Sequence, residues 1–332
     1  MKKKAFNLYL EHMAKLCQTT VREGYNTPLS IKLNNEAQQA LIQAFKDKSD
    51  FLRSTNWLSV RDISGKKLFG ALNGVATGRK VNGRHNAILT YNEHYETVEI
   101  DSGVVIPWVL IDELDSVQEN FEKSYSTLIE LQFLRDMLQI AWNGESKAKN
   151  TEAGDLSDVA PGWIAQLKAH KPENVITSGK SADKITLFSD DADYKNLDEL
   201  ASALRDKLLP EYQSRTDLVF LVGADLVAKQ PSDIFGSGFD RENHGCNNIY
   251  LAQHFGGMPT IIPPYFPRKG AVVTTLKNLS IYTQKGSCHR AVYHNEDETA
   301  VKNTYLRREC YIVENNHLMA AIEHKNVEFT NG

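Results

Sequence analysis

The chain has 332 residues, of which 24% are charged and 41% hydrophobic, and its formal net charge is −4. This composition is that of a folded globular protein, and the negative balance argues against a protein whose main task is to hold nucleic acid by its phosphates. The four cysteines are scattered and form no CxxC pair, which favours a reducing compartment over a disulfide framework. The length allows two domains, or one domain with large excursions.

The sequence predicts neither a membrane span nor a secretory signal. The longest apolar run, over residues 104–111, is interrupted by Pro107 and is too short to cross a bilayer. The chain begins with three lysines, but Glu11, His12 and Lys15 stand where a secretory signal would need its apolar core. We therefore expect no membrane partner.

The first fifty residues predict a loosely attached arm. Apolar side chains recur at helical spacing over residues 5–17 and again over 35–48, and a polar stretch with Gly24 and Pro28 separates the two. Two helices joined by such a link bury little apolar surface of their own. The arm must therefore dock on the body of the chain or on a neighbouring chain.

A long two-stranded ribbon is expected between residues 51 and 107. Short β-type runs are expected over 57–60, 67–72, 87–91 and 95–100, with turn dipeptides Asn73-Gly74 and Asn82-Gly83 between them. The outgoing half is basic and the returning half is acidic. An isolated ribbon is marginally stable in water, so we expect another surface to support it. A surface hairpin with solvated charges is the alternative interpretation.

Residues 111–142 predict one long helix, because they contain no Gly or Pro and their apolar side chains are spaced three or four residues apart. At about 1.5 Å per residue it would be roughly 45–48 Å long, more than a compact domain needs. We expect it to lie across something extended or across other subunits. The apolar positions are Leu114, Val117, Phe121, Leu128, Leu131, Leu138 and Trp142.

Residues 159–276 predict a compact α/β body, and the remaining residues are rich in strands. Asp190, Asp191 and Asp193 are expected to cap the helix that follows them. Helices are expected over 159–171, 196–209 and 224–229. Strands are expected over 184–188, 217–223, 260–264, 271–276, 279–283, 289–294, 304–306, 310–313 and 318–324.

No segment predicts an active site. Gly179-Lys180-Ser181 resembles the end of a phosphate-binding loop, but Asn174 stands where its first glycine should be. His244 and Cys246 have no second pair at zinc spacing. We expect no catalytic residue, no cofactor and no metal. Arm, ribbon and long helix together favour an assembly subunit. An α/β enzyme is the alternative, with Asp225 and Lys229 as its polar candidates.

Seven stretches carry a resemblance that runs nearly end to end: FNLYLEHMAKL, SDFLRSTNWLSVRDISGKKL, VAPGWIAQ, DADYKNLDEL, TDLVFLVGADLVA, GGMPTIIPPYFP and LKNLSIYTQKGSCHR. The last three are specific in order and spacing, whereas the ribbon tip and residues 230–248 match least. These stretches resemble the major capsid proteins of P2-like tailed phages. The resemblance implies an α+β fold of the Hong Kong 97 type, with an N-terminal arm, an E-loop, a peripheral domain (P-domain) with a spine helix, and an axial domain (A-domain).

The resemblance also assigns these parts to residues. The arm would be partly removed by a phage protease, with a cut near residues 28–33. The implied boundaries are 1–50 for the arm, 51–103 for the E-loop region, 104–158 for the P-domain with its spine helix over 111–142, 159–276 for the A-domain, 277–317 for the return to the P-domain sheet, and 318–332 for a C-terminal strand of the A-domain.

The implied function is that of a major capsid protein located in the virion. Copies would assemble in the host bacterial cytoplasm into hexamers and pentamers that tile an icosahedral head shell. The implied partners are a phage scaffold and protease, a portal, and packaged double-stranded DNA bound without sequence preference. A tail or tube protein of the same particle is the alternative structural role, because tube subunits also use long ribbons.

The charge pattern predicts where neighbouring copies meet. We expect the basic half of the ribbon to lie over the spine helix of the next subunit, where acidic side chains crowd the first turns. The expected contact residues are Lys66, Lys67, Arg79, Lys80, Arg84, Asp112, Glu113, Asp115 and Glu119.

Overall fold

The computed structural model describes residues 11, 13–15, 29–67, 72–73, 89–90, 93–110, 113, 121–181, 183–229, 250–295 and 297–329. The chain divides into two compact units. Unit 1 contains residues 1–63, 97–161 and 281–310, and unit 2 contains residues 64–96, 162–280 and 311–332. The division does not test the six capsid domain boundaries implied by the resemblance, which stay predictions.

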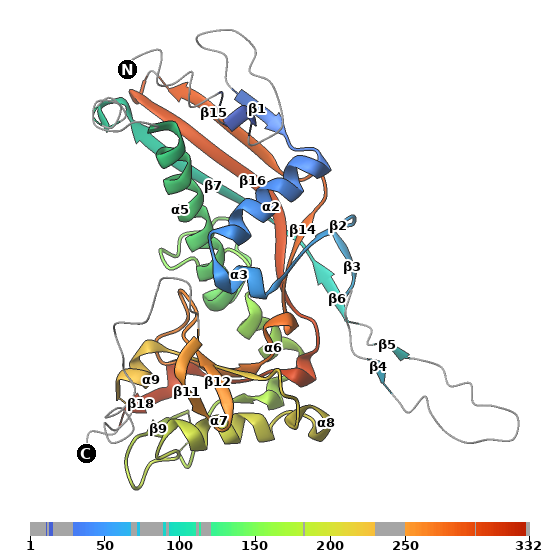
Figure 1. The fold of residues 1–332 in the computed structure, drawn as a ribbon, viewed down its shortest axis with the longest axis vertical. Coiled ribbons are helices and arrows are strands. Elements are labelled where there is room, and N and C mark those ends of the chain that lie inside the picture. The colour runs from blue at the N-terminus through green and yellow to red at the C-terminus, as the bar shows by residue number, and fades with distance from the viewer. Residues whose placement is uncertain are drawn as a thin grey trace, which may run out of the picture. The chain divides into compact units, whose positions relative to one another are not determined.

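The sheet of unit 1 is organised by its longest strand, β16 (Ala300–Val313). β16 pairs antiparallel with β15 (His289–Asn295) and with β7 (Val98–Pro107), which it follows over ten residue pairs. β1 (Leu29–Lys32) forms the edge beside β15, and β14 (Leu279–Gln284) and β2 (Asn56–Val60) complete the six strands. Figure 1 shows the long strands side by side.

The expectation of two separate strands over 304–306 and 310–313 was wrong. Arg307 and Glu309 do not end the strand, because their side chains are both fully buried and form an ion pair, 2.9 Å from Nε to Oε2. Arg307 also donates a hydrogen bond from Nη1 to Oγ of Ser102 on β7, at 2.8 Å. Because the charges are satisfied inside the sheet, β16 continues where the charge pattern alone indicated a break.

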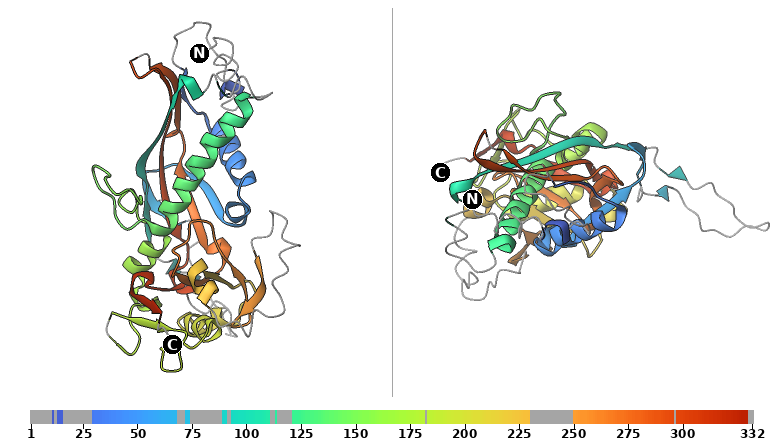
Figure 2. Two further views of the ribbon diagram at one scale, coloured as in Figure 1. Left: turned by 90° about the vertical axis from the view of Figure 1, so that its left-hand side faces the viewer. Right: turned by 90° about the horizontal axis from the view of Figure 1, so that it is seen from above.

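Two helices cover one face of this sheet, α2 (Asn35–Asp47) and α5 (Phe121–Asn143) (Figures 1 and 2). The ring of Tyr305 on β16 lies 6.2 Å from that of Phe45 on α2 and 5.9 Å from that of Phe133 on α5. At about 1.5 Å per residue, α5 is about 35 Å long. The expected helix over 111–142 is thus confirmed from Phe121 onward, while most of its expected first turns lie outside the described residues.

The buried face of α5 is not the face expected from the sequence. Leu128 and Leu131 are 59% and 42% exposed, whereas Ile129, Phe133 and Met137 are buried. The expectation for Leu138 and Trp142 is confirmed, since both are buried. Apolar residues occur on most sides of this helix between 128 and 142, so periodicity did not determine which side faces the sheet.

Polar contacts attach α5 to α2 and to the arm. Lys48, which follows α2, forms an ion pair with the buried carboxylate of Glu130. Ser126 donates a hydrogen bond to the other oxygen of Glu130 at 2.9 Å, and its Oγ lies 3.7 Å from Sδ of Met13. Asn34 accepts a hydrogen bond from the Ala37 amide and so caps α2. The expected second arm helix is confirmed and packs in unit 1, followed by the short α3 (Asp50–Ser54).

Unit 2 is built around a six-stranded sheet whose central strand is β10 (Val219–Val222), buried at every position. Helix α7 (Leu197–Asp206) packs on β13 through buried Leu197, Leu200 and Leu204. The other strands of the sheet are β8 (Val175–Ile176), β11 (Tyr250–Phe255), β12 (Met258–Ile261), β13 (Ala271–Thr274) and β17 (Ala320–Ile322). The helix expected over 196–209 and the strands expected over 217–223, 260–264 and 271–276 are confirmed with shifted bounds. β8 and β11 were not expected, and β17 joins this sheet from outside residues 159–276.

Smaller elements surround this sheet. β9 (Ile185–Leu187) pairs in parallel with β18 (Val327–Phe329). The helices are α6 (Trp163–His170), α8 (Pro210–Gln213) and α9 (Ala224–Lys229), and single 3₁₀ turns occupy Pro172–Asn174, Leu276–Asn278, Asn316–Leu318 and His324–Asn326.

The acidic cluster before α7 does not cap that helix, so this expectation was wrong. The cap is Asn196, whose side chain accepts a hydrogen bond from the Glu199 amide at 2.8 Å. Asp193 instead accepts from the amide and hydroxyl of Thr186, at 2.8 and 2.7 Å, and from the Lys180 amide. Burial alone would raise the pKa of Asp193, but these hydrogen bonds outweigh it and hold the pKa below its usual value. Asp193 therefore closes a loop rather than a helix.

The observed orientation of α5 can be tested with one buried and one exposed leucine of the same helix. Leu138→Ala should lower the free energy of unfolding by about 2–5 kcal/mol, because it removes a buried side chain. Leu128→Ala should change it by less than about 0.5 kcal/mol, because that side chain is already exposed. Urea denaturation measures both, and equal losses for the two variants would contradict the observed orientation of α5.

Candidate subunit-contact site

The ribbon begins at a short two-stranded base. β3 (Ser64–Lys66) pairs antiparallel with β6 (His94–Glu96), with Gly65 opposite Tyr95. A Cβ on Gly65 would lie 2.9 Å from Oη of Tyr95, so only glycine fits against this buried ring. Farther along the ribbon, β4 (Leu72–Asn73) pairs with β5 (Leu89–Thr90).

The return strand expected over 95–100 is split in two. His94–Glu96 belong to the ribbon base, whereas Val98 and the residues after it pair with β16 in unit 1. The break falls at Thr97, whose amide and hydroxyl both donate to the carbonyl of Ile63, at 2.8 and 3.0 Å. The ribbon is therefore shorter at its base than the alternating pattern indicated.

A buried lysine fixes the ribbon base within unit 2. The side chain of Lys67 is 2% exposed, forms an ion pair with Glu93 and donates a hydrogen bond to the carbonyl of Val313 at 2.7 Å. Both oxygens of Glu93 accept from Nδ2 of Asn316, at 2.8 Å each. We call these four residues the base network. Because a buried charge needs a partner, the network ties both ribbon strands to the segment that follows β16.

His317 lies next to this network. Burial is the main cause that lowers the pKa of its imidazole below the ordinary value of 6.5, and Lys171 adds to the effect. Glu93, Glu173 and Glu211 act in the opposite direction without cancelling it. The imidazole therefore favours its neutral form, and protonation opposes the folded arrangement.

The structure describes three of the nine predicted contact residues, Lys66, Lys67 and Glu113. Lys66 is exposed on β3, and Glu113 is exposed as well. Lys67 is engaged by the base network of its own chain. Arg79, Lys80, Arg84, Asp112, Asp115 and Glu119 lie outside the described residues. A contact between copies is not visible in one chain, so it stays a prediction.

Two kinds of candidate residue became apparent only in the structure. Glu93 and Asn316 complete the base network, and no local pattern could have found them, because 223 positions separate them in the sequence. Val105, Val109 and Leu110 form the second kind, with exposures of 53%, 69% and 45%. Their signal was the uncharged stretch after Asp101, which the analysis used only to exclude a membrane span.

The structure places both polar candidates of the enzyme alternative. The described residues contain no group of three or more His, Cys, Asp and Glu side chains that could hold a metal ion. Asp225, a candidate for the enzyme alternative, forms an ion pair with Arg268 at 2.7 Å. The other candidate, Lys229, ends α9 in solvent. Within the same residues, no helix is long and apolar enough to cross a bilayer.

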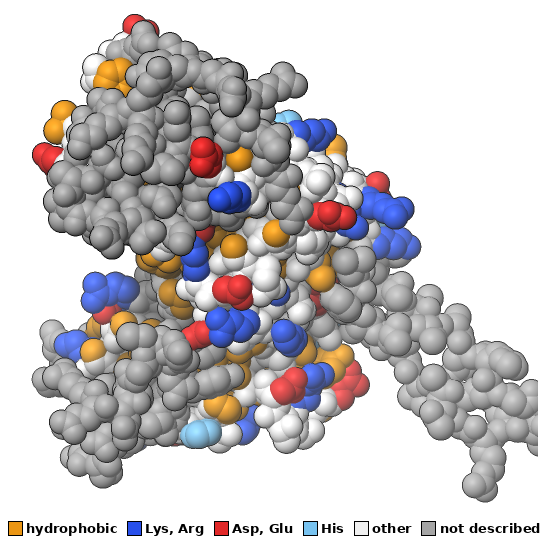
Figure 3. Space-filling view, turned by 45° about the horizontal axis from the view of Figure 1, so that its top comes forward, with side chains coloured by type: hydrophobic (Ala, Val, Ile, Leu, Met, Phe, Trp, Pro, Cys, Tyr) orange, Lys and Arg blue, Asp and Glu red, His pale blue; other side chains and the backbone are white. Residues whose placement is uncertain are grey.

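Charges of both signs occur together among the described residues. On the face shown in Figure 3, their Lys and Arg side chains are interspersed with Asp and Glu side chains.

A six-stranded sheet covered by two helices, an α/β unit, and a β-ribbon inserted in the sequence between β2 and β7 define the class of subunits with the Hong Kong 97-type capsid fold. A chain of the satellite phage P4 procapsid including size determination (Sid) protein has this fold, with a TM-score of 0.73 and 22% identity, over 88% of this chain and 99% of that chain. The expected fold class is confirmed.

The chain belongs to the P2 family of phage major capsid proteins, because the model of that family matches residues 5–325. It is 26% identical over 326 residues to the capsid proteins of Escherichia phage P2, covering 93% of this chain and 90% of that sequence. It is also 26% identical over 320 residues to the major capsid protein of Serratia phage KSP20, covering 89% and 86%. The chain is thus a virion protein that assembles into a multi-subunit capsid shell.

The base network predicts unequal roles for two adjacent lysines. Lys67→Met should lower the free energy of unfolding by about 1–3 kcal/mol, because Glu93 and the Val313 carbonyl lose their donor in a buried place. The matched variant Lys66→Met should change it by less than about 0.5 kcal/mol, since Lys66 is exposed. Denaturation curves measure both, and an unchanged Lys67→Met curve would show that the network does not hold the base.

The lowered pKa of His317 predicts a pH dependence of stability. The unfolded chain binds the proton more readily than the folded chain, so stability should fall as the pH drops through about 6.5 and below. His317→Gln removes this proton uptake and should give a flatter curve between about pH 7.5 and pH 5. Urea midpoints across that range measure the difference, and parallel curves for the two proteins would contradict it.

Proposed function

We propose that the chain forms hexamers and pentamers that tile an icosahedral head shell around the double-stranded DNA of a tailed phage. The observation that carries the proposal is the family match over residues 5–325, together with a fold like that of a procapsid subunit. Assembly takes place in the host cytoplasm with a phage scaffold, protease and portal as partners, and the protein has no enzymatic activity. DNA contacts on the inner face are weak and independent of sequence.

The ribbon is the element that joins neighbours within a ring. In this proposal its basic half lies over the spine helix of the next copy, and Lys66, Arg79, Lys80 and Arg84 face Asp112, Glu113, Asp115 and Glu119. Lys67 supports this contact from within its own chain, because the base network sets the direction in which the ribbon leaves unit 2.

The energy of such a contact comes from repetition. An exposed ion pair contributes only about 0–1 kcal/mol, so a few pairs at one contact cannot hold two copies together. A closed ring repeats the contact at every subunit and adds buried apolar surface, which raises the total without a strong single bond. Weak contacts also let misplaced subunits dissociate before the shell closes.

Electron microscopy of the protein produced with its phage scaffold is the decisive experiment. Closed shells with rings of six and five support the proposal. Tubes would support the tail or tube alternative, and small discrete oligomers with saturable turnover of a substrate would support the enzyme alternative. Either result would overturn the proposed function.

Charge reversal tests the ribbon contact. Combined Arg79→Glu, Lys80→Glu and Arg84→Glu should leave the thermal midpoint of the subunit unchanged and reduce shell yield at least tenfold, because like charges then meet at every copy in the ring. Adding Asp112→Lys, Asp115→Lys and Glu119→Lys should restore much of the yield. Shells are counted by sedimentation and microscopy.

The matched control changes the same net charge elsewhere. Lys147, Lys149 and Lys195 are exposed, and their combined reversal to Glu should leave shell yield close to that of the unchanged chain. Equal losses in the two triple variants would mean that net charge, and not the ribbon contact, limits assembly.

A further inference from the structure

The edge of β7 that faces away from β16 has no partner strand among the described residues. On its other edge, β7 pairs with β16 along its whole length. An edge strand presents a row of unpaired backbone N–H and C=O groups, and these recruit another strand unless charge, proline or a covering segment protects them. A ten-residue strand is long for an unprotected edge.

Charge protects only the first half of this edge. Glu99 and Asp101 are exposed there, and Glu99 forms an ion pair with Arg308 at 2.9 Å. Residues 102–110 carry no charged side chain. They include Val105, Val109 and Leu110, which are 53%, 69% and 45% exposed. The one edge-blocking residue of this stretch is Pro107, at the very end of the strand.

We propose that the edge of β7 over residues 102–106 pairs antiparallel with the same residues of a second copy of this chain, about a local two-fold axis. The proposal rests on the proposed function, because it needs a shell in which copies meet. A second copy is the favoured occupant because the segment is complementary to itself: it is uncharged, it offers both donors and acceptors, and exposed apolar side chains flank it.

The two carboxylates restrict the register. With the axis at Val104, Asp101 lies opposite Pro107 and Glu99 lies beyond the end of the partner strand, so neither acidic residue faces its own copy. An axis at Asp101 would place two like charges directly opposite each other, which is unfavourable in a sheet. The charge pattern therefore allows self-pairing in the uncharged half and disfavours it in the acidic half.

Pairing would also cover the exposed apolar residues. Val105 is one residue from the proposed two-fold axis. Val109 and Leu110 lie just after the end of β7 at Pro107. The apolar area that they remove from water would supplement the backbone hydrogen bonds. A neighbouring ribbon or a strand of the scaffold could occupy the same edge, and these two occupants are separate outcomes of the test.

Crosslinking within purified shells tests the pairing. With the axis at Val104, the two copies of residue 105 lie about 8 Å apart and the two copies of residue 99 lie about 33 Å apart, at about 3.3 Å per residue along the strand and about 4.8 Å between strands. A short thiol-to-thiol crosslinker should therefore convert Val105→Cys shells largely to covalent dimers. Glu99→Cys, exposed on the same side of the same strand, should give at least tenfold less dimer. The unchanged chain controls for the native cysteines, of which Cys288 and Cys310 are buried.

Each outcome decides the proposal. Dimers at Val105→Cys that map to residue 105 in both copies support it. Equal dimer from Glu99→Cys, or a crosslink from residue 105 to the ribbon or to the scaffold, overturns it. Normal Val105→Cys shells without dimers overturn it while the proposed function stands. If the unchanged chain forms no shells, both proposals fail.

A second variant keeps the test independent of crosslinking. Val105→Lys places two like charges near the axis and should reduce shell yield at least tenfold, whereas Val105→Thr should leave the yield within twofold of the unchanged chain. Subunit folding is checked by the thermal midpoint, which neither change should move, because residue 105 is exposed in the single chain. Normal shell yield from Val105→Lys would overturn the pairing.

Discussion

The ion pair between Arg307 and Glu309 is the constraint on which the sheet of unit 1 depends. Both side chains are fully buried on β16, 2.9 Å apart, and Arg307 reaches β7 through Ser102. A buried pair adds little net stability compared with an apolar core, because removing both charges from water is costly. The pair instead affects which register of strand pairing the sheet adopts. A shift of one residue in the pairing of β16 with β7 would separate Arg307 from Ser102 and turn both charged side chains to the other face of the sheet, so the buried charges disfavour that shift.

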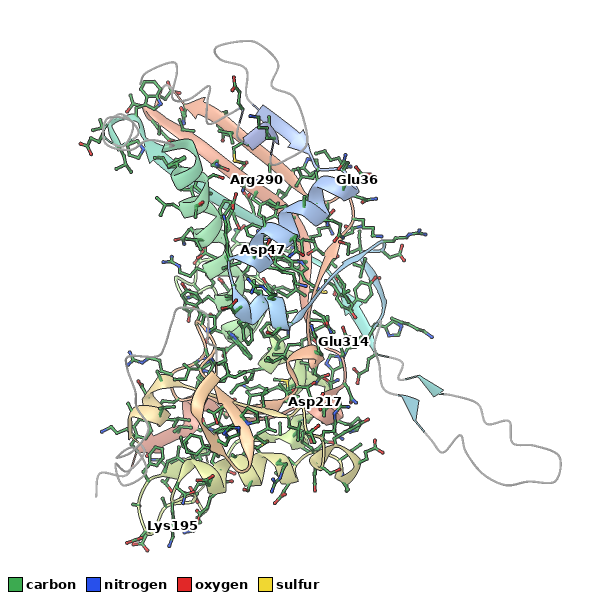
Figure 4. All side chains as sticks on the ribbon, viewed as in Figure 1. Glu36, Asp47, Lys195, Asp217, Arg290 and Glu314 are labelled. Carbon is green, nitrogen blue, oxygen red and sulfur yellow. The ribbon has the colours of Figure 1, made fainter. Side chains whose placement is uncertain are left out.

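Aromatic rings complete the surroundings of these charges. The guanidinium of Arg307 lies 4.8 Å from the centre of the Tyr305 ring. The guanidinium of Arg290, which is labelled in Figure 4, lies 5.4 Å from the same ring and 5.1 Å from that of Phe133 on α5. Burial raises the pKa of Tyr305 well above its ordinary value and that of the nearby Cys288 to about 11. Neither group ionises near neutral pH. The cluster is therefore a structural element that docks α5 on the sheet, and it offers no reactive thiolate.

The contacts of the ribbon differ in strength. Its base is held strongly inside the chain by Lys67, Glu93, Val313 and Asn316, while the contacts proposed for its exposed charges are weak. A shell subunit needs this division. A rigid base sets the geometry of the ring, and weak contacts between copies allow errors to be corrected. The pairing proposed for the edge of β7 would be another contact between copies of this kind.

The sequence by itself determined the elements whose signal is local. The apolar run of β10, the amphipathic α2 and α7, the long helix from Phe121 and the resemblance to P2-like capsid proteins were all readable from neighbouring residues. Only the tertiary structure decided which side of α5 is buried, because that helix is apolar on several sides and the sheet selects one. It also decided that β16 is continuous, that Asn196 and not Asp193 caps α7, and that Lys67 faces its own chain. Arg307 and Lys67 find partners far away in the sequence, at Ser102 and Val313, and no local pattern records a partner that only folding brings near.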